Sequence, residues 1–215
     1  MKDILFDLDG TITDPMLGIT KSVAYALKYF EIEVKDLKDL IPFIGPPLVD
    51  SFQEFYHFNK EQANIAVVKY REYFKETGIF ENEPYQGIEQ ILKSLIEKGY
   101  RLSIATSKPH VFASRILEHF NLIHYFSNVY GSELDGTRNA KGEVIAYALN
   151  DLKCDPKKTI MVGDRKHDVI GAHENHLKCI GVLYGYGSLE EFDSCHADYV
   201  VDSVEALYEL LISLD

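Results

Sequence analysis

The sequence lacks long hydrophobic runs, because no uninterrupted apolar segment approaches the roughly 18 residues of a membrane span. The first acid, Asp3, comes too early for a secretory signal. We therefore expect a cytoplasmic protein without a membrane partner. Cysteine is also scarce: Cys154, Cys179 and Cys195 are an odd number and form no CxxC pair. They are predicted to be reduced thiols rather than a disulfide framework or a zinc site.

Basic residues are outnumbered, with 22 lysines and arginines against 34 acids and a net charge of -12. Such a surface repels a polyanion, so we expect no nucleic-acid partner. The composition of the 215 residues, 46% hydrophobic and 26% charged, is ordinary for a folded chain and excludes a wholly disordered one. The length allows one large domain, or a medium domain that carries an insertion.

Short apolar strands alternate with amphipathic helices over most of the sequence. Strands are predicted at about 3–8, 101–106, 129–131, 159–162, 179–183 and 198–201, and helices at about 88–95, 109–120, 141–149, 167–175 and from 203 onward. This alternation is typical of an α/β fold, a Rossmann-like parallel sheet wrapped by helices on both faces.

A helical block interrupts the alternation after the first strand. Helices are predicted at about 16–30 and 47–56, and a third follows a capping residue, Asn59. Between the first two, the proline-rich segment 41–47 is expected to hold no regular element. We interpret the block as an inserted cap domain. The expected boundaries are 1–13 and 86–215 for the core and 14–85 for the cap.

Polar residues follow four of the predicted strands, at the edge where a doubly wound sheet binds its ligands. They are Asp7, Asp9, Thr106, Lys141, Asp164 and Asp168. Clustered carboxylates repel one another unless a cation joins them, and oxygen ligands of this kind suit Mg²⁺. The turns Leu8–Thr11 and Ser107–Lys108 add N–H donors that can face an anion. The pattern predicts a site for Mg²⁺ and a phosphoryl group.

Four motifs in order carry a resemblance to a known family. They are the DxDGT run Asp7–Thr11 at the end of a hydrophobic strand, Thr106 at the end of a second strand, Lys141, and the GDxxxD run Gly163–Asp168. The chain resembles the haloacid dehalogenase superfamily of phosphotransferases over essentially its whole length.

Other segments look like one branch of that superfamily. They are 9–15, 43–48, 105–109 and 131–138. The branch resembles phosphoglycolate phosphatases, includes 5′-nucleotidase-like members and carries a helical cap of the C1 type after the first motif. Asp14-Pro15 differs from the Asp-Ser pair common in sugar-phosphate relatives, which disfavours a sugar substrate.

The resemblance implies a role for each acid. Asp7 would attack phosphorus and form an aspartyl-phosphate. Asp9 would protonate the leaving oxygen and then activate the hydrolytic water. Asp7, the backbone carbonyl of Asp9 and Asp164 would hold Mg²⁺, and Asp168 would bind it directly or through water.

The remaining site residues would bind phosphate. Thr106 and the Ser107 N–H would hold phosphoryl oxygens, and Lys141 would balance the negative charge. The phosphate-binding set is completed by Leu8, Gly10, Thr11 and Lys108. Arg138 either reaches a substrate anion or is an ordinary surface arginine.

The expected function is Mg²⁺-dependent hydrolysis of a small phosphomonoester, with phosphoglycolate and a nucleoside monophosphate as leading substrates. Family dehalogenases lack an acid at the position of Asp9, so its presence favours an oxygen leaving group. Alternatives are a sugar phosphomutase resembling β-phosphoglucomutase, a pyrophosphatase, or a non-catalytic phosphate-binding protein. The complete set of acids, threonine and lysine argues against the last.

Overall fold

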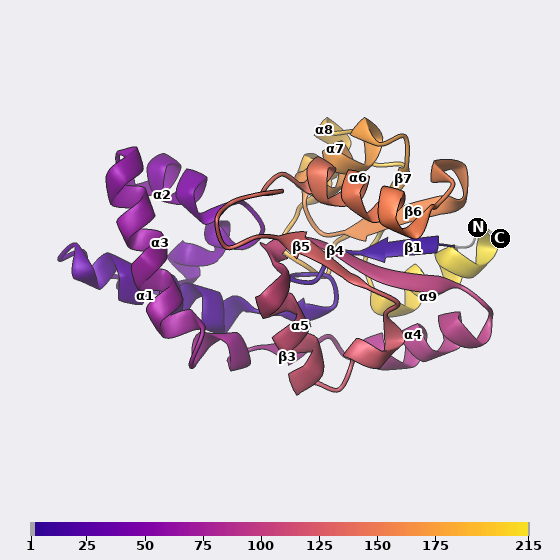
Figure 1. Cartoon of the computed structure of the whole chain (residues 1–215), viewed down its shortest axis with the longest axis horizontal. Coiled ribbons are helices and arrows are strands. Elements are labelled where there is room, and N and C mark those ends of the chain that lie inside the picture. The colour runs from indigo at the N-terminus through magenta and orange to yellow at the C-terminus, as the bar shows by residue number, and fades with distance from the viewer. Residues whose placement is uncertain (1–2, 215) are drawn as a thin grey trace. The chain divides into compact units, whose positions relative to one another are not determined.

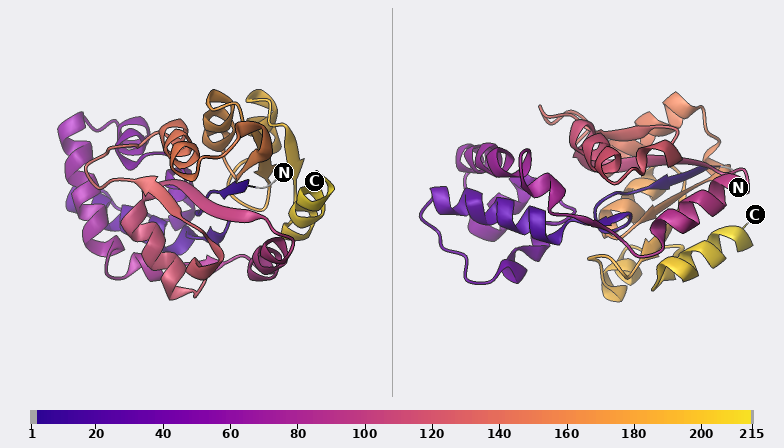
Figure 2. Two further views of the ribbon diagram at one scale, coloured as in Figure 1. Left: turned by 45° about the vertical axis from the view of Figure 1, so that its right-hand side comes forward. Right: turned by 90° about the horizontal axis from the view of Figure 1, so that it is seen from below.

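The computed structural model describes residues 3–214, which separate into two compact units (Figures 1 and 2). The core unit is made of two segments, one that ends at Asp14 and one that begins at Pro84, and the cap unit is Pro15–Glu83. Where the chain passes between them, β2 (Thr13–Asp14) and β3 (Glu83–Pro84) form a two-stranded sheet.

A six-stranded parallel sheet forms the centre of the core unit, in the order β5-β4-β1-β6-β7-β8. The strands are β1 (Asp3–Phe6), β4 (Arg101–Pro109), β5 (Val129–Ser132), β6 (Thr159–Gly163), β7 (Lys178–Val182) and β8 (Tyr199–Val201). This confirms the α/β fold predicted from the alternation. The central strand β1 is apolar because both of its faces are covered: Ile4, Leu5 and Phe6 have no exposed surface.

Helices cover both faces of the sheet (Figure 1). On one face lie α6 (Lys141–Leu152), α7 (Lys166–Glu174) and α8 (Leu189–Ser194), and on the other α4 (Ile88–Glu97), α5 (His110–His119) and α9 (Val204–Ser213). Short 3₁₀ turns, η3 (Ile123–Tyr125) and η4 (Pro156–Lys158), precede β5 and β6. Leu5 and Met161 of the sheet belong to one buried cluster. It also contains Val144 of α6, Val169 of α7 and Phe192 of α8. This packing holds the strand ends rigidly in place.

Two strand boundaries differ from the predicted ones. The first strand was expected to reach residue 8, but β1 ends at Phe6 because the chain turns there. The second was expected to end at 106, but β4 continues to Pro109, which pairs with Ser132 of β5 after a register shift that begins at Ala105. Such a shift interrupts the regular pairing of β4 with β5, as a bulge does.

The cap unit consists of α1 (Met16–Tyr29), α2 (Leu48–Tyr56) and α3 (Lys60–Phe74), with 3₁₀ turns η1 (Leu37–Phe43) and η2 (Gly78–Phe80). The expectation that 41–47 holds no regular element is wrong for its first three residues, which lie in η1. A short 3₁₀ turn tolerates Pro42 because the fixed φ of proline suits it. Among the helices of residues 3–214, none combines the length and the apolar character needed to cross a bilayer.

Asn59 caps α3 as the sequence predicted. Its side chain accepts a hydrogen bond from the Gln62 N–H at 2.9 Å, and the Gln62 side chain accepts one from the Asn59 N–H at 3.0 Å. This reciprocal pair satisfies two backbone donors that the first helical turn would otherwise leave without partners.

We predict that Asn59→Ala lowers the free energy of unfolding by about 1 kcal/mol, because the cap hydrogen bond is lost. Urea denaturation of the whole chain, followed by circular dichroism, measures the change. Asn64→Ala is the matched control, since Asn64 is exposed inside the same helix and alanine has the higher helix propensity there. If the two variants unfold at the same urea concentration, the capping box contributes nothing.

Candidate active site

Four charged side chains are brought together by three separate segments of the core unit. Asp7 directly follows β1, and its N–H donates to the carbonyl of Val162 on β6 at 2.9 Å. Asp164 directly follows β6, and Asp168 lies in the first turn of α7. Lys141 is the first residue of α6. The carboxyl ends of β1 and β6 therefore meet the start of two helices.

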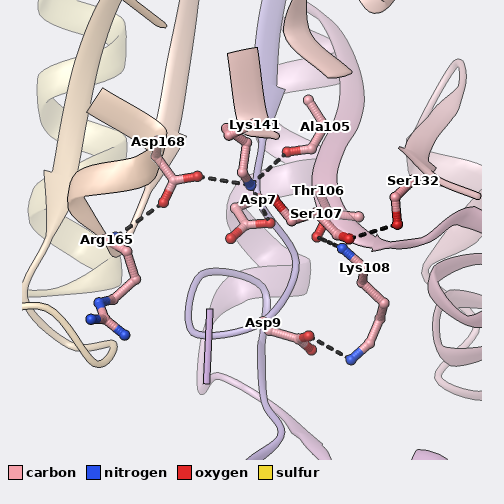
Figure 3. Close-up of polar contacts among 10 residues, drawn as sticks. All are labelled: Asp7, Asp9, Ala105, Thr106, Ser107, Lys108, Ser132, Lys141, Arg165 and Asp168. Carbon is pink, nitrogen blue, oxygen red and sulfur yellow. Dashed lines mark hydrogen bonds and ion pairs between the residues drawn. The ribbon is translucent and has the colours of Figure 1, made fainter. Parts of the chain in front are cut away.

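The ammonium group of Lys141 lies between two carboxylates (Figure 3). Its Nζ is 2.8 Å from an oxygen of Asp7 and 2.8 Å from an oxygen of Asp168, and it donates to the carbonyl of Ala105 at 3.1 Å. The Lys141 side chain is only 4% exposed. Burial alone would lower the pKa of Lys141, but Asp168 and Asp7 raise it above its ordinary value. The lysine therefore stays charged although it begins a helix, where a cation is disfavoured.

Asp7, Asp164 and Asp168 form a buried acidic cluster. Each offers a carboxylate oxygen, and these oxygens all lie within 4.8 Å of one another. Burial, followed by repulsion from Asp168 and Asp7, raises the pKa of Asp164 well above its ordinary value. Its Oδ2 accepts a hydrogen bond from the Tyr186 N–H at 2.9 Å, but its buried Oδ1 has no hydrogen-bond partner among residues 3–214. A cation with oxygen ligands fits this set, because it would satisfy that atom and offset the repulsion.

Asp9 lies apart from the acidic cluster and pairs with Lys108 at the end of β4 (Figure 3). The ammonium of Lys108 is 2.5 Å from Asp9 Oδ2, while Asp9 Oδ1 is buried without a hydrogen-bond partner in the described chain. Burial raises the pKa of Asp9, although Lys108 opposes the shift. The sequence predicts Lys108 as a phosphate ligand, and in this structure its ammonium contacts the Asp9 carboxylate.

The turn after Asp7 is shaped by its own hydrogen bonds. The Gly10 N–H donates to the carbonyl of Thr13 at 2.8 Å, and the Thr11 N–H to that of Leu8 at 3.3 Å. These two amides were expected to face an anion, and in this conformation they hold the turn instead. Gly10 has φ +82°, and a Cβ there would lie 2.0 Å from Asp164 Oδ2. Glycine is needed so that the turn can approach Asp164 this closely.

The other predicted phosphate ligands lie along the end of β4 and beyond β5. The Lys108 N–H donates to Thr106 Oγ1 at 3.3 Å, and the Ser132 hydroxyl donates to the Ser107 carbonyl at 2.8 Å (Figure 3). Arg138 is not among these groups: its guanidinium contacts the Glu133 carboxylate and lies 4.4 Å above the Tyr147 ring.

Sequence reasoning missed the segment Tyr184–Gly187, which follows β7. Besides the Tyr186 amide on Asp164, the Tyr184 hydroxyl donates to the Thr11 carbonyl at 3.1 Å and the Tyr186 hydroxyl donates to Asp14. The signal that could have revealed this segment is its place at a strand end. The rule that ligands bind beyond the carboxyl ends of the strands identifies the acids, and it points equally to the residues that follow β7.

A family comparison decides how this arrangement is classified. Residues 4–182 match the model of the haloacid dehalogenase-like hydrolases. The chain belongs to that family. The expected resemblance is therefore confirmed, and the chain is a hydrolase of the haloacid dehalogenase-like type with phosphatase-named relatives.

Individual relatives cover the chain almost completely. A 5′-nucleotidase of Pseudomonas aeruginosa is 45% identical over 98% of this chain and 96% of its own length. The tyrosine-protein kinase PtkA of Mycobacterium tuberculosis is 35% identical over 97% of this chain and 72% of its own. A pyrophosphatase, PpaX of Halalkalibacterium halodurans, is 32% identical over 97% and 95%. The crystal structure of a predicted phosphatase from Clostridium acetobutylicum has TM-score 0.97 and 50% identity, over 99% and 98% of the two chains.

We predict that Asp164→Asn raises the melting temperature of the metal-free protein at pH 7. A pKa above the unfolded value of 3.8 means that the folded chain favours the neutral acid. The ionised group therefore costs stability at neutral pH, and this cost disappears as the pH falls; an amide imitates the neutral form. A gain of about 1 kcal/mol corresponds to roughly 2–4 °C.

Thermal melts in EDTA and in Mg²⁺ measure this effect. The wild type is expected to gain stability from Mg²⁺, because a ligand that binds the folded state stabilises that state. Asp164→Asn is expected to gain none, because it lacks the carboxylate that would hold the ion. Asp193→Asn, at an exposed position of α8, is the matched control and should change neither melt. A variant that melts below the wild type in EDTA would contradict the prediction.

Proposed function

We propose that this protein is a Mg²⁺-dependent phosphatase that hydrolyses a small phosphomonoester through an aspartyl-phosphate on Asp7. The observation that carries the proposal is the buried cluster of Asp7, Asp164 and Asp168 around the Lys141 ammonium. Asp7, Asp164 and Asp168 would hold Mg²⁺ through their side chains and Asp9 through its backbone carbonyl. When bound, Mg²⁺ supplies positive charge that stabilises the phosphoryl oxygens during transfer.

In the first half-reaction, a carboxylate oxygen of Asp7 attacks phosphorus while the bond to the leaving oxygen breaks. Lys141 holds the Asp7 carboxylate at 2.8 Å and so orients the nucleophile. Asp9 gives its proton to the leaving oxygen, which departs as a neutral alcohol. Lys108 holds Asp9 Oδ2, so Oδ1, which has no hydrogen-bond partner within residues 3–214, is the oxygen that carries this proton.

In the second half-reaction, water attacks the phosphorus of the aspartyl-phosphate. Asp9, now ionised, takes a proton from that water, and the bond between phosphorus and the Asp7 oxygen breaks. Inorganic phosphate leaves and Asp7 is again a carboxylate. The raised pKa of Asp9 serves both steps, because a group that titrates nearer neutral pH is a better acid and a better base.

A nucleoside monophosphate is the substrate that we favour. The 5′-nucleotidase of P. aeruginosa is 45% identical to this chain along nearly its full length, against 32% for the pyrophosphatase PpaX. A fold alone does not select the substrate, so the higher identity is what supports the nucleotidase.

We predict that phosphate is released fastest from a nucleoside 5′-monophosphate, and that EDTA and Asp7→Asn each reduce the rate to background. Colorimetric phosphate release measures this over nucleoside monophosphates, phosphoglycolate, hexose phosphates, pyrophosphate and phosphotyrosine. The amide of Asp7→Asn cannot act as the nucleophile, although it preserves the shape of the side chain.

Asp193→Asn is the control that should retain full activity, because it is the same change at an exposed position. A preference for pyrophosphate or phosphoglycolate would reject the nucleoside monophosphate as the substrate and would leave the proposed mechanism intact. Slow release from every compound, together with isomerisation of a hexose phosphate that requires a hexose bisphosphate, would point to a phosphomutase. Full activity of Asp7→Asn would overturn the mechanism itself.

We predict that Asp9→Asn lowers the steady-state rate by about 10²–10⁴-fold, the usual effect of removing a general acid and base. With p-nitrophenyl phosphate the leaving group needs no proton, so the first step should survive and the second should fail. One equivalent of p-nitrophenol should then appear in a burst, with the phosphoryl group retained on the protein. Stopped-flow absorbance and intact mass spectrometry measure both. Steady turnover without a burst would show that Asp9 is not the base that activates the hydrolytic water.

A further inference from the structure

The turn Tyr184–Gly187 reaches two functional parts of the core unit through one residue. Tyr186 donates its backbone N–H to Asp164 Oδ2 at 2.9 Å and its phenolic hydroxyl to the carboxylate of Asp14. Asp164 belongs to the acidic cluster, and Asp14 is the last residue of the core unit before the chain enters the cap unit. One residue, through its backbone and its side chain, therefore ties this connecting segment to the acidic cluster.

The amide of Tyr186 decides which oxygen of Asp164 remains for a ligand. Oδ2 is occupied by this hydrogen bond, while Oδ1 is buried and has no hydrogen-bond partner among residues 3–214. If the amide moved, the carboxylate could rotate and offer either oxygen. Holding a ligating carboxylate in one orientation is a common way for neighbouring groups to raise metal affinity.

The turn fits tightly against Asp164 but is flexible by composition. A Cβ at Gly185 would lie 2.3 Å from the Gly10 carbonyl and 2.4 Å from Asp164 Cβ, so only glycine fits. Gly185 and Gly187 flank Tyr186, and glycine gives a free chain many alternative conformations. The position of the Tyr186 amide must therefore be fixed by side-chain contacts. Those contacts include the Tyr186 hydroxyl on Asp14 and the Tyr184 hydroxyl on the Thr11 carbonyl. Tyr85 adds to them, because its side chain hydrogen-bonds Tyr186 and its ring lies 4.9 Å from the ring of Tyr184.

We propose that Tyr186 is a positioning residue for the metal site, which acts by anchoring its hydroxyl on Asp14 so that its amide holds Asp164 with Oδ1 free for the cation. This inference rests on the cation of the proposed function and adds a residue pair to it. Tyr186 and Asp14 touch no reacting atom. Their effect is on the affinity of the site for the cation.

The test is direct binding of Mn²⁺ to the whole chain, followed by electron paramagnetic resonance of the free ion, with no substrate present. Tyr186→Phe removes the hydroxyl and keeps the ring and the amide. It is expected to weaken Mn²⁺ binding by about tenfold, as losses in the outer shell of a metal site do. The kcat at saturating Mg²⁺ should stay near that of the wild type.

A second variant, Asp14→Ala, removes the acceptor of the same contact and should weaken binding to the same extent. The double variant should bind like Tyr186→Phe, because that change already removes the hydrogen bond to Asp14. Tyr125→Phe is the matched control: it removes a phenol-to-carboxylate hydrogen bond to Glu89, 3.0 Å long, away from the site. It should bind Mn²⁺ like the wild type.

Each other outcome overturns the inference in a distinguishable way. Wild-type affinity in Tyr186→Phe would reject the positioning role and leave the metal site intact. Additive losses in the double variant would mean that Tyr186 and Asp14 act separately. Equal weakening by Tyr125→Phe would show a general loss of stability. Absence of Mn²⁺ binding by the wild type would reject the inference together with the metal requirement of the proposed function.

Discussion

The ion pairs of Lys141 are the interaction on which the rest of the site depends. Three buried carboxylates share one small volume, and one ammonium lies between two of them at 2.8 Å from each. A single positive charge cannot neutralise three negative ones, and burial makes the remaining charge more costly. The cluster is therefore stable only with raised pKa values or with a further cation. A phosphoryl group would add more negative charge, and for that reason the proposed mechanism includes a cation.

The fold meets this constraint by placing the charges on rigid elements. β1 and β6 are neighbouring central strands, so Asp7 and Asp164 emerge side by side at their carboxyl ends. Lys141 and Asp168 come from the first turns of the adjacent helices α6 and α7, which pack on the same face of the sheet. The apolar cluster beneath these helices fixes their starts. Because each charged group is held by backbone packing, the geometry requires little rearrangement when a ligand arrives.

The sequence predicts the fold and most of the acidic cluster, because both follow from simple periodic rules. Apolar strands followed by acids identify Asp7 and Asp164, and the strand-end rule places them together. The rule does not say which partner a long side chain contacts. The ammonium of Lys108 lies on Asp9, and no spacing pattern encodes that contact. The strand-end rule points to the turn after β7, but it does not encode the contact of the Tyr186 hydroxyl with Asp14, 172 residues away in sequence.

The reaction class of this chain is easier to infer than its substrate, because strand-end positions are predictable and individual side-chain contacts are not. Every residue placed in the proposed chemistry lies in the core unit, at the end of a strand or in the first turn of a helix. Relatives named 5′-nucleotidase, pyrophosphatase and tyrosine-protein kinase all match this chain over at least 97% of its length. Those names differ in the group that gives or accepts the phosphoryl group, while each involves breaking a bond between phosphorus and oxygen. In the proposed mechanism, Asp7 with the charged Lys141 beside it serves the shared step. Selection of the substrate must therefore arise from residues that the shared step does not use.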